Sequence, residues 1–245
     1  MKSNNSQSEC NNCSCYCTSG NKNPVNNVTF SINEGEFTVI CGRNGSGKSV
    51  LMSLIAQLDE PDFGTIEVPR NSVGLVFQDA DAQILGETPE EDVAFGLKNN
   101  NVNLTVLRNK TEQTLKECGL YEKRCFPARQ MSGGEKRRLA VAGILAMERN
   151  IIIFDEPFAN LDYPGVLQVS SILKNLKQQG KTVIVLTHEL EKILGLADRF
   201  IILDKSCIQY DGTPRDGLTL NLEEFGIRNP LAAYKSAEDL FWGAK

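Results

Sequence analysis

A glycine-rich segment at residues 42–49 has the residue types and spacing of a phosphate-binding loop. Glycines let the backbone curl so that successive N–H groups face phosphate oxygens, and a helix that follows adds its positive end. Lys48 would then bridge the β- and γ-phosphates of a nucleotide, and the Ser49 hydroxyl would bind Mg²⁺. The alternative is an ordinary turn before a helix, and the strand predicted in front of the loop argues against it. The further candidates for nucleotide binding are Gly42, Asn44, Gly45, Ser46, Gly47 and Val50.

Two acidic residues follow an apolar run at residues 151–154. Asp155 and Glu156 would therefore lie at the carboxyl end of a buried strand, where ligands bind in an open α/β sheet. Asp155 is placed to hold Mg²⁺ through its water shell, and Glu156 to polarise an attacking water molecule. Pro157 ends the strand, so the alternative is an acidic turn without chemistry. The phosphate-binding loop in the same chain favours the catalytic interpretation.

His188 is the single histidine of the sequence and comes just after another apolar run, residues 182–186. A lone histidine is more often a surface residue or a satisfied core residue than a catalytic one. Its position just beyond the end of a predicted strand, like that of Asp155 and Glu156, favours a place in the same site.

A second loop of small residues, 131–135, precedes a helix predicted over residues 135–147. The amino-terminal end of a helix attracts anions, so this loop is a second candidate anion site. A nucleotide loop and a separate anion loop in one chain suggest two half-sites that meet between two molecules.

Apolar periodicity predicts the elements that must position these residues. Residues 28–32 alternate like a half-buried strand, and residues 79–149 are mostly helical in pattern. Near-continuous apolar strands such as 182–186 are buried on both faces, which indicates a parallel sheet covered by helices. The fold class is therefore α/β, with a helical insertion in a parallel-sheet core. The other predicted strands are 37–41, 151–154 and 199–203, and the predicted helices are 48–58, 89–98, 105–118, 135–147 and 165–179.

Composition excludes several classes of protein. The net charge of −5 over 245 residues gives no general electrostatic reason to bind nucleic acid. No apolar run approaches the roughly 20 residues of a membrane helix, and the start of the chain does not resemble a signal peptide. We therefore expect a cytoplasmic protein, for which any membrane role must go through a partner.

Together, these motifs resemble the ATPase domains of ABC proteins, in order and in spacing, from about residue 26 to residue 215. The resemblance implies a P-loop NTPase core with a mostly parallel sheet, an N-terminal antiparallel β region and an inserted helical subdomain. It divides a single nucleotide-binding domain into a RecA-like core (1–78 and 150–213), the helical subdomain (79–149) and a short C-terminal extension (214–245). ATP and Mg²⁺ are the implied cofactors. Two such domains would sandwich two ATP molecules, and hydrolysis would reopen the pair.

The resemblance also implies roles for residues outside the phosphate loop. Gln78 would reach the Mg²⁺ ion and the attacking water and couple the site to a membrane subunit. Ser132 and Gly134, with Gly133 between them, would bind the γ-phosphate held by the other subunit. Asp162 would lie in a loop that crosses the dimer interface, and His188 would contact the same γ-phosphate.

The sequence departs from the family pattern at three places. Met131 and Glu135 stand where Leu and Gln are commoner in the signature loop (residues 131–135), and activity is still expected. Val50 replaces a Thr, which removes one hydroxyl contact to the α-phosphate and predicts only a modest loss of affinity. Residues 8–17 align with the family's first strand, where Tyr16, rather than Cys17, would stack on adenine.

Eight cysteines are many for a protein of this size, and four of them crowd the start of the chain. Alternation along a strand would place three of the four on one face, and buried cysteines behave as small hydrophobes. Four thiolates on one metal ion need a turn rather than a strand, so packing is favoured over a metal site. These residues are Cys10, Cys13, Cys15 and Cys17.

Residues 76–85 and 88–96, together with 134–138 and the tail at 222–227, resemble the energy-coupling-factor branch of the family. Such transporters import vitamins or cobalt and nickel ions. They combine two ATPases, a transmembrane coupling protein and a substrate-binding membrane protein, which would place this chain on the inner face of the cell membrane. A structural alternative makes residues 83–96 an amphipathic helix that packs on the core.

Two other classes of ABC protein are alternatives to a transporter subunit. A soluble ABC ATPase of iron–sulfur cluster assembly would need a soluble scaffold as its partner. ABC proteins of chromosome maintenance or translation carry long coiled coils or two ATPase units in one chain, and this sequence has neither. The sequence leaves open whether the active pair is a homodimer or a heterodimer.

Overall fold

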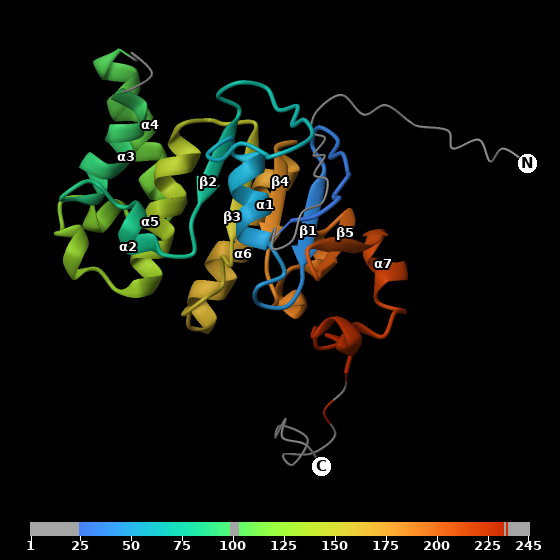
Figure 1. Ribbon diagram of the computed structural model, residues 1–245. Helices are drawn as coiled ribbons and strands as arrows, with labels where there is room; N and C mark the ends of the chain where they lie inside the picture. Colours follow the sequence, from blue (N-terminus) through green and yellow to red (C-terminus); the bar gives the residue numbers. More distant parts are fainter. Residues whose placement is uncertain (1–24, 99–102, 233, 235–245) are drawn as a thin grey trace, which may run out of the picture.

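The computed structural model describes residues 25–98, 103–232 and 234, and these form a six-stranded sheet flanked by helices (Figure 1). The strand order is β2-β3-β4-β1-β5-β6; the first five strands are parallel, and only β6 is antiparallel, to β5. The strands are β1 Phe37–Cys41, β2 Val73–Val76, β3 Ile151–Asp155, β4 Thr182–Leu186, β5 Arg199–Asp204 and β6 Cys207–Gly212.

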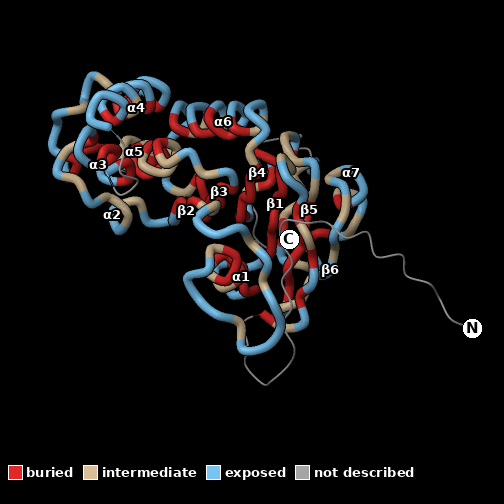
Figure 2. The backbone as a smooth tube through the Cα atoms, turned by 90° about the horizontal axis from the view of Figure 1, so that it is seen from above, coloured by how far each residue is buried: buried red, intermediate tan, exposed pale blue. Residues whose placement is uncertain are grey.

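Helices cover both faces of the sheet and extend beyond its β2 edge. Seen from above, α1 and α6 lie on opposite faces, while α2 to α5 form a helical group beside β2 (Figure 2). The helices are α1 Lys48–Ile55, α2 Ala80–Gln83, α3 Pro89–Lys98, α4 Leu104–Glu117, α5 Gly133–Ala146, α6 Tyr163–Gln178 and α7 Pro214–Gly217. Short 3₁₀ turns occur at Tyr121–Lys123, Ala128–Gln130, Leu190–Lys192, Leu194–Leu196 and Leu222–Phe225.

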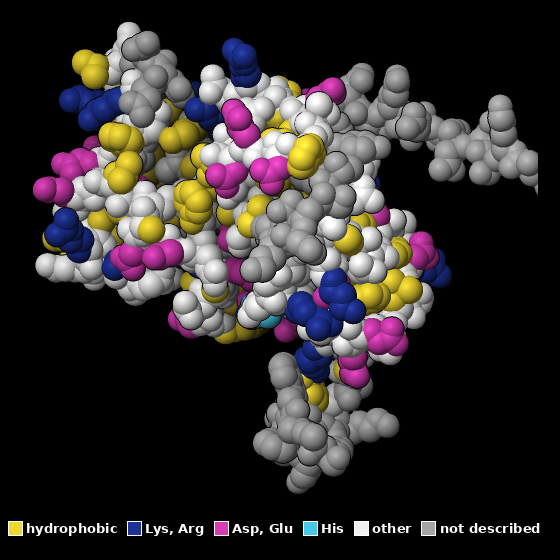
Figure 3. All heavy atoms as spheres, viewed as in Figure 1, with side chains coloured by type: hydrophobic (Ala, Val, Ile, Leu, Met, Phe, Trp, Pro, Cys, Tyr) yellow, Lys and Arg dark blue, Asp and Glu magenta, His cyan; other side chains and the backbone are white. Residues whose placement is uncertain are grey.

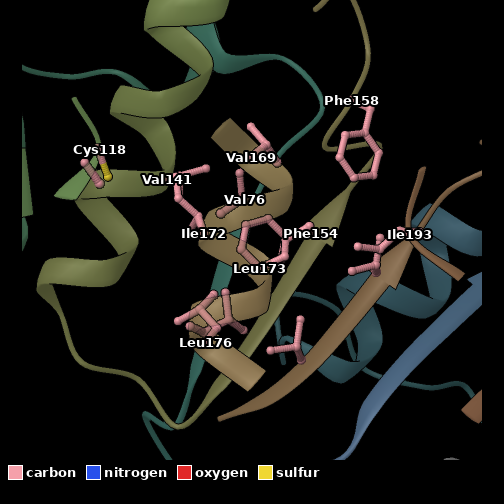
Figure 4. Close-up of a cluster of buried hydrophobic side chains, with 14 of the residues drawn as sticks. Val76, Cys118, Val141, Phe154, Phe158, Val169, Ile172, Leu173, Leu176 and Ile193 are labelled. Atoms are coloured by element: carbon pink, nitrogen blue, oxygen red, sulfur yellow. The ribbon is translucent and has the colours of Figure 1, made fainter. Parts of the chain in front are cut away.

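Alternating strand residues build two apolar layers, one on each face of the sheet. Phe154 of β3 packs in the larger cluster with Leu173 of α6 and Val141 of α5 (Figure 4). Ile153, the neighbour of Phe154, belongs instead to the smaller cluster, together with Leu51 of α1. Each fully buried aliphatic or aromatic side chain contributes about 1.5–3 kcal/mol relative to its exposed state. The sheet is thus held rigidly between two layers, and its loops project from a fixed edge.

Most predicted elements form within two residues of their expected bounds, and β1, β4 and α3 match them at both ends. One expectation and one structural alternative are wrong. Residues 28–32 bury Val28, Phe30 and Ile32, as the alternation predicts, but they make only an isolated bridge at Ser31 and no strand. Residues 83–96 are not one helix, because α2 ends at Gln83 and α3 begins only at Pro89.

The expected N-terminal antiparallel region is therefore not seen in the described part of the chain. The antiparallel pairing that the sheet does contain is the β5–β6 hairpin, which lies far along the sequence. The buried segment before β1 is tied to this hairpin, since the Asn26 N–H donates to the Ser206 carbonyl at 2.7 Å. Residues 8–17 lie outside the described residues.

Candidate active site

The phosphate loop (residues 42–49) passes from β1 into α1 over the end of β5. A Cβ atom at Gly42 would lie 2.0 Å from the Leu203 carbonyl oxygen, so only glycine allows this crossing. Gly47 begins α1 with a φ of 103°, in the left-handed region that favours glycine, and makes no side-chain cap. The amino-terminal end of α1 therefore keeps its positive partial charge available to a ligand.

Lys48 is held inside this loop. Its side chain is buried, with 8% of the residue exposed, and its Nζ donates to the carbonyls of Gly42 at 2.7 Å and Arg43 at 3.1 Å. Burial lowers the pKa of the Lys48 ammonium, and the nearby Glu156 carboxylate opposes that shift. A buried cation aimed at the loop's own carbonyls is suited to phosphate oxygens.

Ser46 provides a test of whether a phosphate fits this loop. Its Oγ is buried and has no hydrogen-bond partner in the structure. Buried hydroxyls almost always have a partner, so this atom lacks a group that a phosphate oxygen would supply. The phosphate loop thus fits the ligand that its sequence predicts. Asn44, Gly45, Ser49 and Val50 lie in or directly after the same loop.

Glu156 is the most tightly held acid of the site. It is buried, and its φ of 46° is uncommon for a residue other than glycine, a kind of strain that concentrates at functional sites. Its Oε2 accepts from the Thr187 hydroxyl at 3.0 Å, and its Oε1 lies 2.8 Å from His188 Nδ1. A carboxylate in its ionised form only accepts, so the His188 tautomer with its proton on Nδ1 would donate to it.

Asp155 lies beside Glu156 in a region where charges influence each other strongly. Burial raises the pKa of the Asp155 carboxyl first, and the Glu156 charge raises it further, whereas Lys48 and Arg137 lower it. Two adjacent buried acids attract a cation, and a carboxylate, a hydroxyl and an amide oxygen are ligands that Mg²⁺ accepts. Asp155, Ser49 and Gln78 therefore fit the predicted Mg²⁺ site by their chemistry.

The strand register brings these residues to one edge of the sheet. Ile40 pairs with Leu186, and Leu186 pairs with Asp155, so the ends of β1, β3 and β4 are level. Asp155 is the last residue of β3, and Lys48, Glu156 and His188 come after these strand ends. Figure 1 shows the three strands running side by side into the loops at this edge.

Gln78 lies just past the end of β2, at the same edge, and is exposed. Its carbonyl accepts from Arg137 Nη2 at 2.5 Å, and the preceding Phe77 carbonyl accepts from Arg137 Nη1 at 2.6 Å. Sequence reasoning missed Arg137 and the buried Thr187. A polar residue directly after an apolar strand was the available signal for Thr187.

The signature loop begins α5 in the helical group. Ser132 is the N-cap: its Oγ accepts from the Glu135 N–H at 3.3 Å, and Glu135 Oε2 accepts from the Ser132 N–H at 3.0 Å. This capping box satisfies two helix-end donors. Lys123 Nζ donates to Glu135 Oε1 at 2.5 Å. Ser132 and Gly133 are exposed and Gly134 is half-buried, so the loop faces outward.

Asp162 caps α6, since its Oδ1 accepts from the Gly165 N–H at 3.0 Å. A Cβ on Gly134 would lie 3.6 Å from Leu161, so the signature loop and the loop before α6 are neighbours within one chain. No hydrogen bond described here joins either loop to the phosphate loop. Sequence-predicted residues thus fall into a phosphate-loop set and an outward-facing set.

Several predictions concern residues outside the described part of the chain. Tyr16, the predicted adenine-stacking residue, is one of them, so that prediction stays untested. The same holds for the packing of Cys10, Cys13, Cys15 and Cys17. Within the described ranges, no group of three or more His, Cys, Asp or Glu residues could hold a metal ion, and none of the helices is long and apolar enough to span a membrane.

Comparison with known proteins gives consistent results. The sequence profile described as ABC transporter matches residues 25–159. The energy-coupling factor transporter ATP-binding protein EcfA1 of Clostridium novyi is 41% identical over 206 residues, which cover 78% of this chain and 73% of the relative. The EcfA1 protein of Streptococcus sanguinis is 37% identical over 222 residues, covering 84% and 79%.

Solved structures resemble the fold as well as the sequence. The structure of CbiO1 from Clostridium perfringens, described as part of the ABC transporter complex CbiONQ, has a TM-score of 0.77 at 28% identity and covers 86% of this chain and 92% of its own. A dimeric ATP-binding cassette in a post-hydrolysis state, bound to ADP and Pi, has a TM-score of 0.73 at 28% identity, with 83% and 97% covered.

Proposed function

This chain belongs to the ATP-binding subunits of ABC transporters, of the energy-coupling-factor type, and we propose that it hydrolyses ATP to power a membrane importer. The observation that carries the proposal is the buried Glu156 carboxylate, held between Thr187 and His188 at the sheet edge where the phosphate loop begins. A fixed carboxylate beside a phosphate loop is the arrangement that nucleotide hydrolysis needs.

The phosphate loop binds the nucleotide in this proposal. The backbone N–H groups of residues 42–49 and the end of α1 surround the phosphates, and Lys48 leaves the carbonyls of Gly42 and Arg43 for phosphate oxygens. Ser49, Asp155 and Gln78 would hold Mg²⁺. When bound, Mg²⁺ offsets the charge that develops on the transferred phosphoryl group.

Glu156 acts as the general base. Its carboxylate accepts a proton from the attacking water, and the bonds from Thr187 and His188 fix the orientation of that carboxylate. Of the two side chains that bond to Glu156, only His188 is exposed, with 60% of its side chain accessible. It can therefore reach the γ-phosphate while it holds the base.

A second ATPase subunit completes the site. Ser132, Gly133 and Gly134 face outward, so they would bind the γ-phosphate in the phosphate loop of the partner subunit, and Asp162 would lie at the interface between the two. The partner is a second copy of this chain or a related ATPase. Since Lys48, Glu156 and His188 are all present, both sites of a homodimer would be active.

The helical group would dock on a transmembrane coupling protein. Residues 79–149 act as the helical subdomain. Leu85 and Phe95 expose apolar side chains on it, and Phe77 does so just before it. Figure 3 shows hydrophobic side chains among charged ones over this part of the molecule. The chain would therefore sit on the cytoplasmic face of the membrane, in a complex that imports vitamins or cobalt or nickel ions.

A role in iron–sulfur cluster assembly is not favoured, because the relatives reported above are named as transporter subunits. Purification of the tagged chain in mild detergent distinguishes a role in a membrane importer from a role in cluster assembly. Co-purification of a polytopic membrane protein supports the importer, and recovery of soluble scaffold proteins alone contradicts it.

Replacement of Glu156 by Gln tests the hydrolytic mechanism. Glu156→Gln should retain ATP binding, lose at least about 100-fold in phosphate release, and accumulate an ATP-bound dimer on size-exclusion chromatography. The matched control is Glu191→Gln, an exposed glutamate three residues past His188, which should turn over normally. Near-normal turnover of Glu156→Gln would contradict the role of Glu156 as base.

A further inference from the structure

Arg137 is a buried cation in the segment 134–138, and the sequence analysis assigns it no role of its own. It lies on α5, five residues after Ser132, and only 3% of it is exposed. We propose that Arg137 is a positioning residue for hydrolysis. It holds the backbone of Gln78 in place, and it makes residues 77–79 between β2 and α2 (the Gln78 loop) move with α5 (the signature helix). This inference rests on the function proposed above.

The contacts of Arg137 are directed at two consecutive carbonyls. Nη1 donates to the Phe77 carbonyl at 2.6 Å and Nη2 donates to the Gln78 carbonyl at 2.5 Å. These are the first two residues after β2, where the chain leaves the sheet. A planar guanidinium that holds two adjacent carbonyls fixes the peptide plane between them, and so limits the directions that the Gln78 side chain can take.

Two further interactions attach the same loop to α5 and to α2. Lys136, next to Arg137, forms an ion pair with Asp81 of α2 at 2.5 Å. Gln83 closes the loop, because its Oε1 accepts from the Phe77 N–H and its Nε2 donates to the Leu75 carbonyl, each at 3.0 Å. The Gln78 loop is therefore joined to α5 directly through the buried Arg137, and indirectly through α2, which Lys136 holds.

Nearby acids offset part of the cost of burying the Arg137 charge. Burial lowers the pKa of the guanidinium, but the charges of Asp155, Asp79 and Glu156 oppose the shift. Arg137 thus lies within electrostatic reach of the two acids of the active site, and in turn it lowers the pKa of Asp155. One side chain connects the signature helix, the Gln78 loop and the acids at the end of β3.

The helix α5 therefore follows the proposed anion-binding loop and also carries Arg137, the residue that holds Gln78. When the signature loop engages a phosphate on the partner subunit, any displacement of α5 passes to the Gln78 carbonyl through a rigid fork. Lysine could not replace arginine here, because an ammonium is a point charge without the planar fork that spans two carbonyls. We thus expect Arg137→Lys to keep the buried charge and to lose the positioning.

The test compares two arginines that join α5 or its end to the two ends of β2. Arg149, just beyond α5, donates from Nη1 to the Asn71 carbonyl at 2.6 Å, before β2 begins and away from the active site. The variants are Arg137→Lys, Arg137→Met and the control Arg149→Met, each in the full chain. The measurements are kcat and KM for Mg·ATP, the Kd for a fluorescent ATP analogue, and thermal unfolding to confirm folding.

We expect Arg137→Lys and Arg137→Met to lower kcat by about 10- to 100-fold while the Kd changes by less than about threefold. Arg149→Met should keep kcat within about twofold of the parent. In a Gln78→Ala background, Arg137→Lys should lower kcat by less than about threefold further, because the side chain that Arg137 positions is gone.

Two results would overturn the inference: a kcat for Arg137→Lys within about threefold of the parent, or losses from Arg137→Lys and Gln78→Ala that multiply. If Arg137→Met fails to fold, Arg137→Lys alone decides the matter. A parent chain that hydrolyses no ATP would contradict the proposed function instead, so the two failures are distinguishable.

Discussion

The phosphate loop and the signature loop are both runs of small residues that lead into a helix, but they treat the helix end in opposite ways. Gly47 begins α1 without a side-chain cap, and Lys48 is buried beneath the loop. Ser132 begins α5 with a complete capping box, and its loop is largely exposed. We propose that the first loop is an anion site within one chain. The end of α5 is already capped by its own side chains, and we propose that the second loop presents its remaining donors to another molecule.

This difference agrees with the two half-sites that the sequence suggests, and it separates nucleotide binding from assembly. Nucleotide binding should depend on the phosphate loop even in a single molecule, whereas the signature loop should matter only when two ATPase subunits meet. Loss of a phosphate-loop residue is therefore expected to abolish binding, and loss of a signature residue to weaken assembly.

The largest effect is expected from Lys48→Ala. Lys48 is the only basic residue of α1, so its replacement removes the buried ammonium that would bind the phosphates. ATP affinity should therefore fall by at least about 100-fold. Titration with a fluorescent ATP analogue measures this. Lys174→Ala, an exposed lysine on α6, is the matched control. Retained affinity in Lys48→Ala would break the comparison, because the first loop would then not be the main binding site.

Ser132→Ala should act on assembly and not on binding. Loss of the N-cap costs about 1 kcal/mol of stability, and loss of a hydroxyl at the interface should weaken the ATP-dependent dimer by roughly tenfold. Analytical ultracentrifugation in a Glu156→Gln background measures the dimer. Asn103→Ala removes another helix cap, the one that accepts from the Thr105 N–H at 2.9 Å on α4, and should lower stability without an effect on the dimer. If both variants weakened the dimer equally, Ser132 would act only as a helix cap.

Glu135 should make the contribution of the signature loop to folding stability depend on pH. The hydrogen bond from Lys123 and then that from the Ser132 N–H lower the pKa of the Glu135 carboxyl. A lowered pKa in the folded state adds stability above the ordinary glutamate value, and this stability is lost as pH falls through the folded value. Glu135→Gln keeps the capping geometry, so it should cost up to about 1 kcal/mol at pH 7 and less near pH 4. Urea unfolding at both pH values measures the difference; an equal cost at both would contradict a contribution from charge.

The smallest effect is expected at Val50, on the first turn of α1. Its side chain packs against the smaller apolar cluster, so Val50→Thr would add one hydroxyl near the nucleotide and disturb little else. We expect ATP affinity to rise by less than about tenfold, as for a single neutral hydrogen bond. Calorimetric titration decides this; a hundredfold gain would show that the phosphate loop is incomplete without that hydroxyl.

Sequence patterns predicted the core well, because strands buried on both faces and helices with one apolar face follow directly from periodicity. The strand β4 and the helix α3 form with the expected bounds, and Asp155 ends β3 with Glu156 directly after it, at the carboxyl end of the strand as expected. The pattern at residues 28–32 predicted which side chains are buried but not the backbone, since burial of alternate residues does not require a paired strand.

By itself, the sequence determined the phosphate loop, the two acids after β3 and the family to which the chain belongs, because these depend on residue types at short, fixed spacing. Only the tertiary structure decided that Thr187 and His188 hold Glu156, that Arg137 holds Gln78, and that Lys123 pairs with Glu135. Each of these contacts joins residues from different elements. Their distances depend on strand register and helix packing, which the local sequence does not specify.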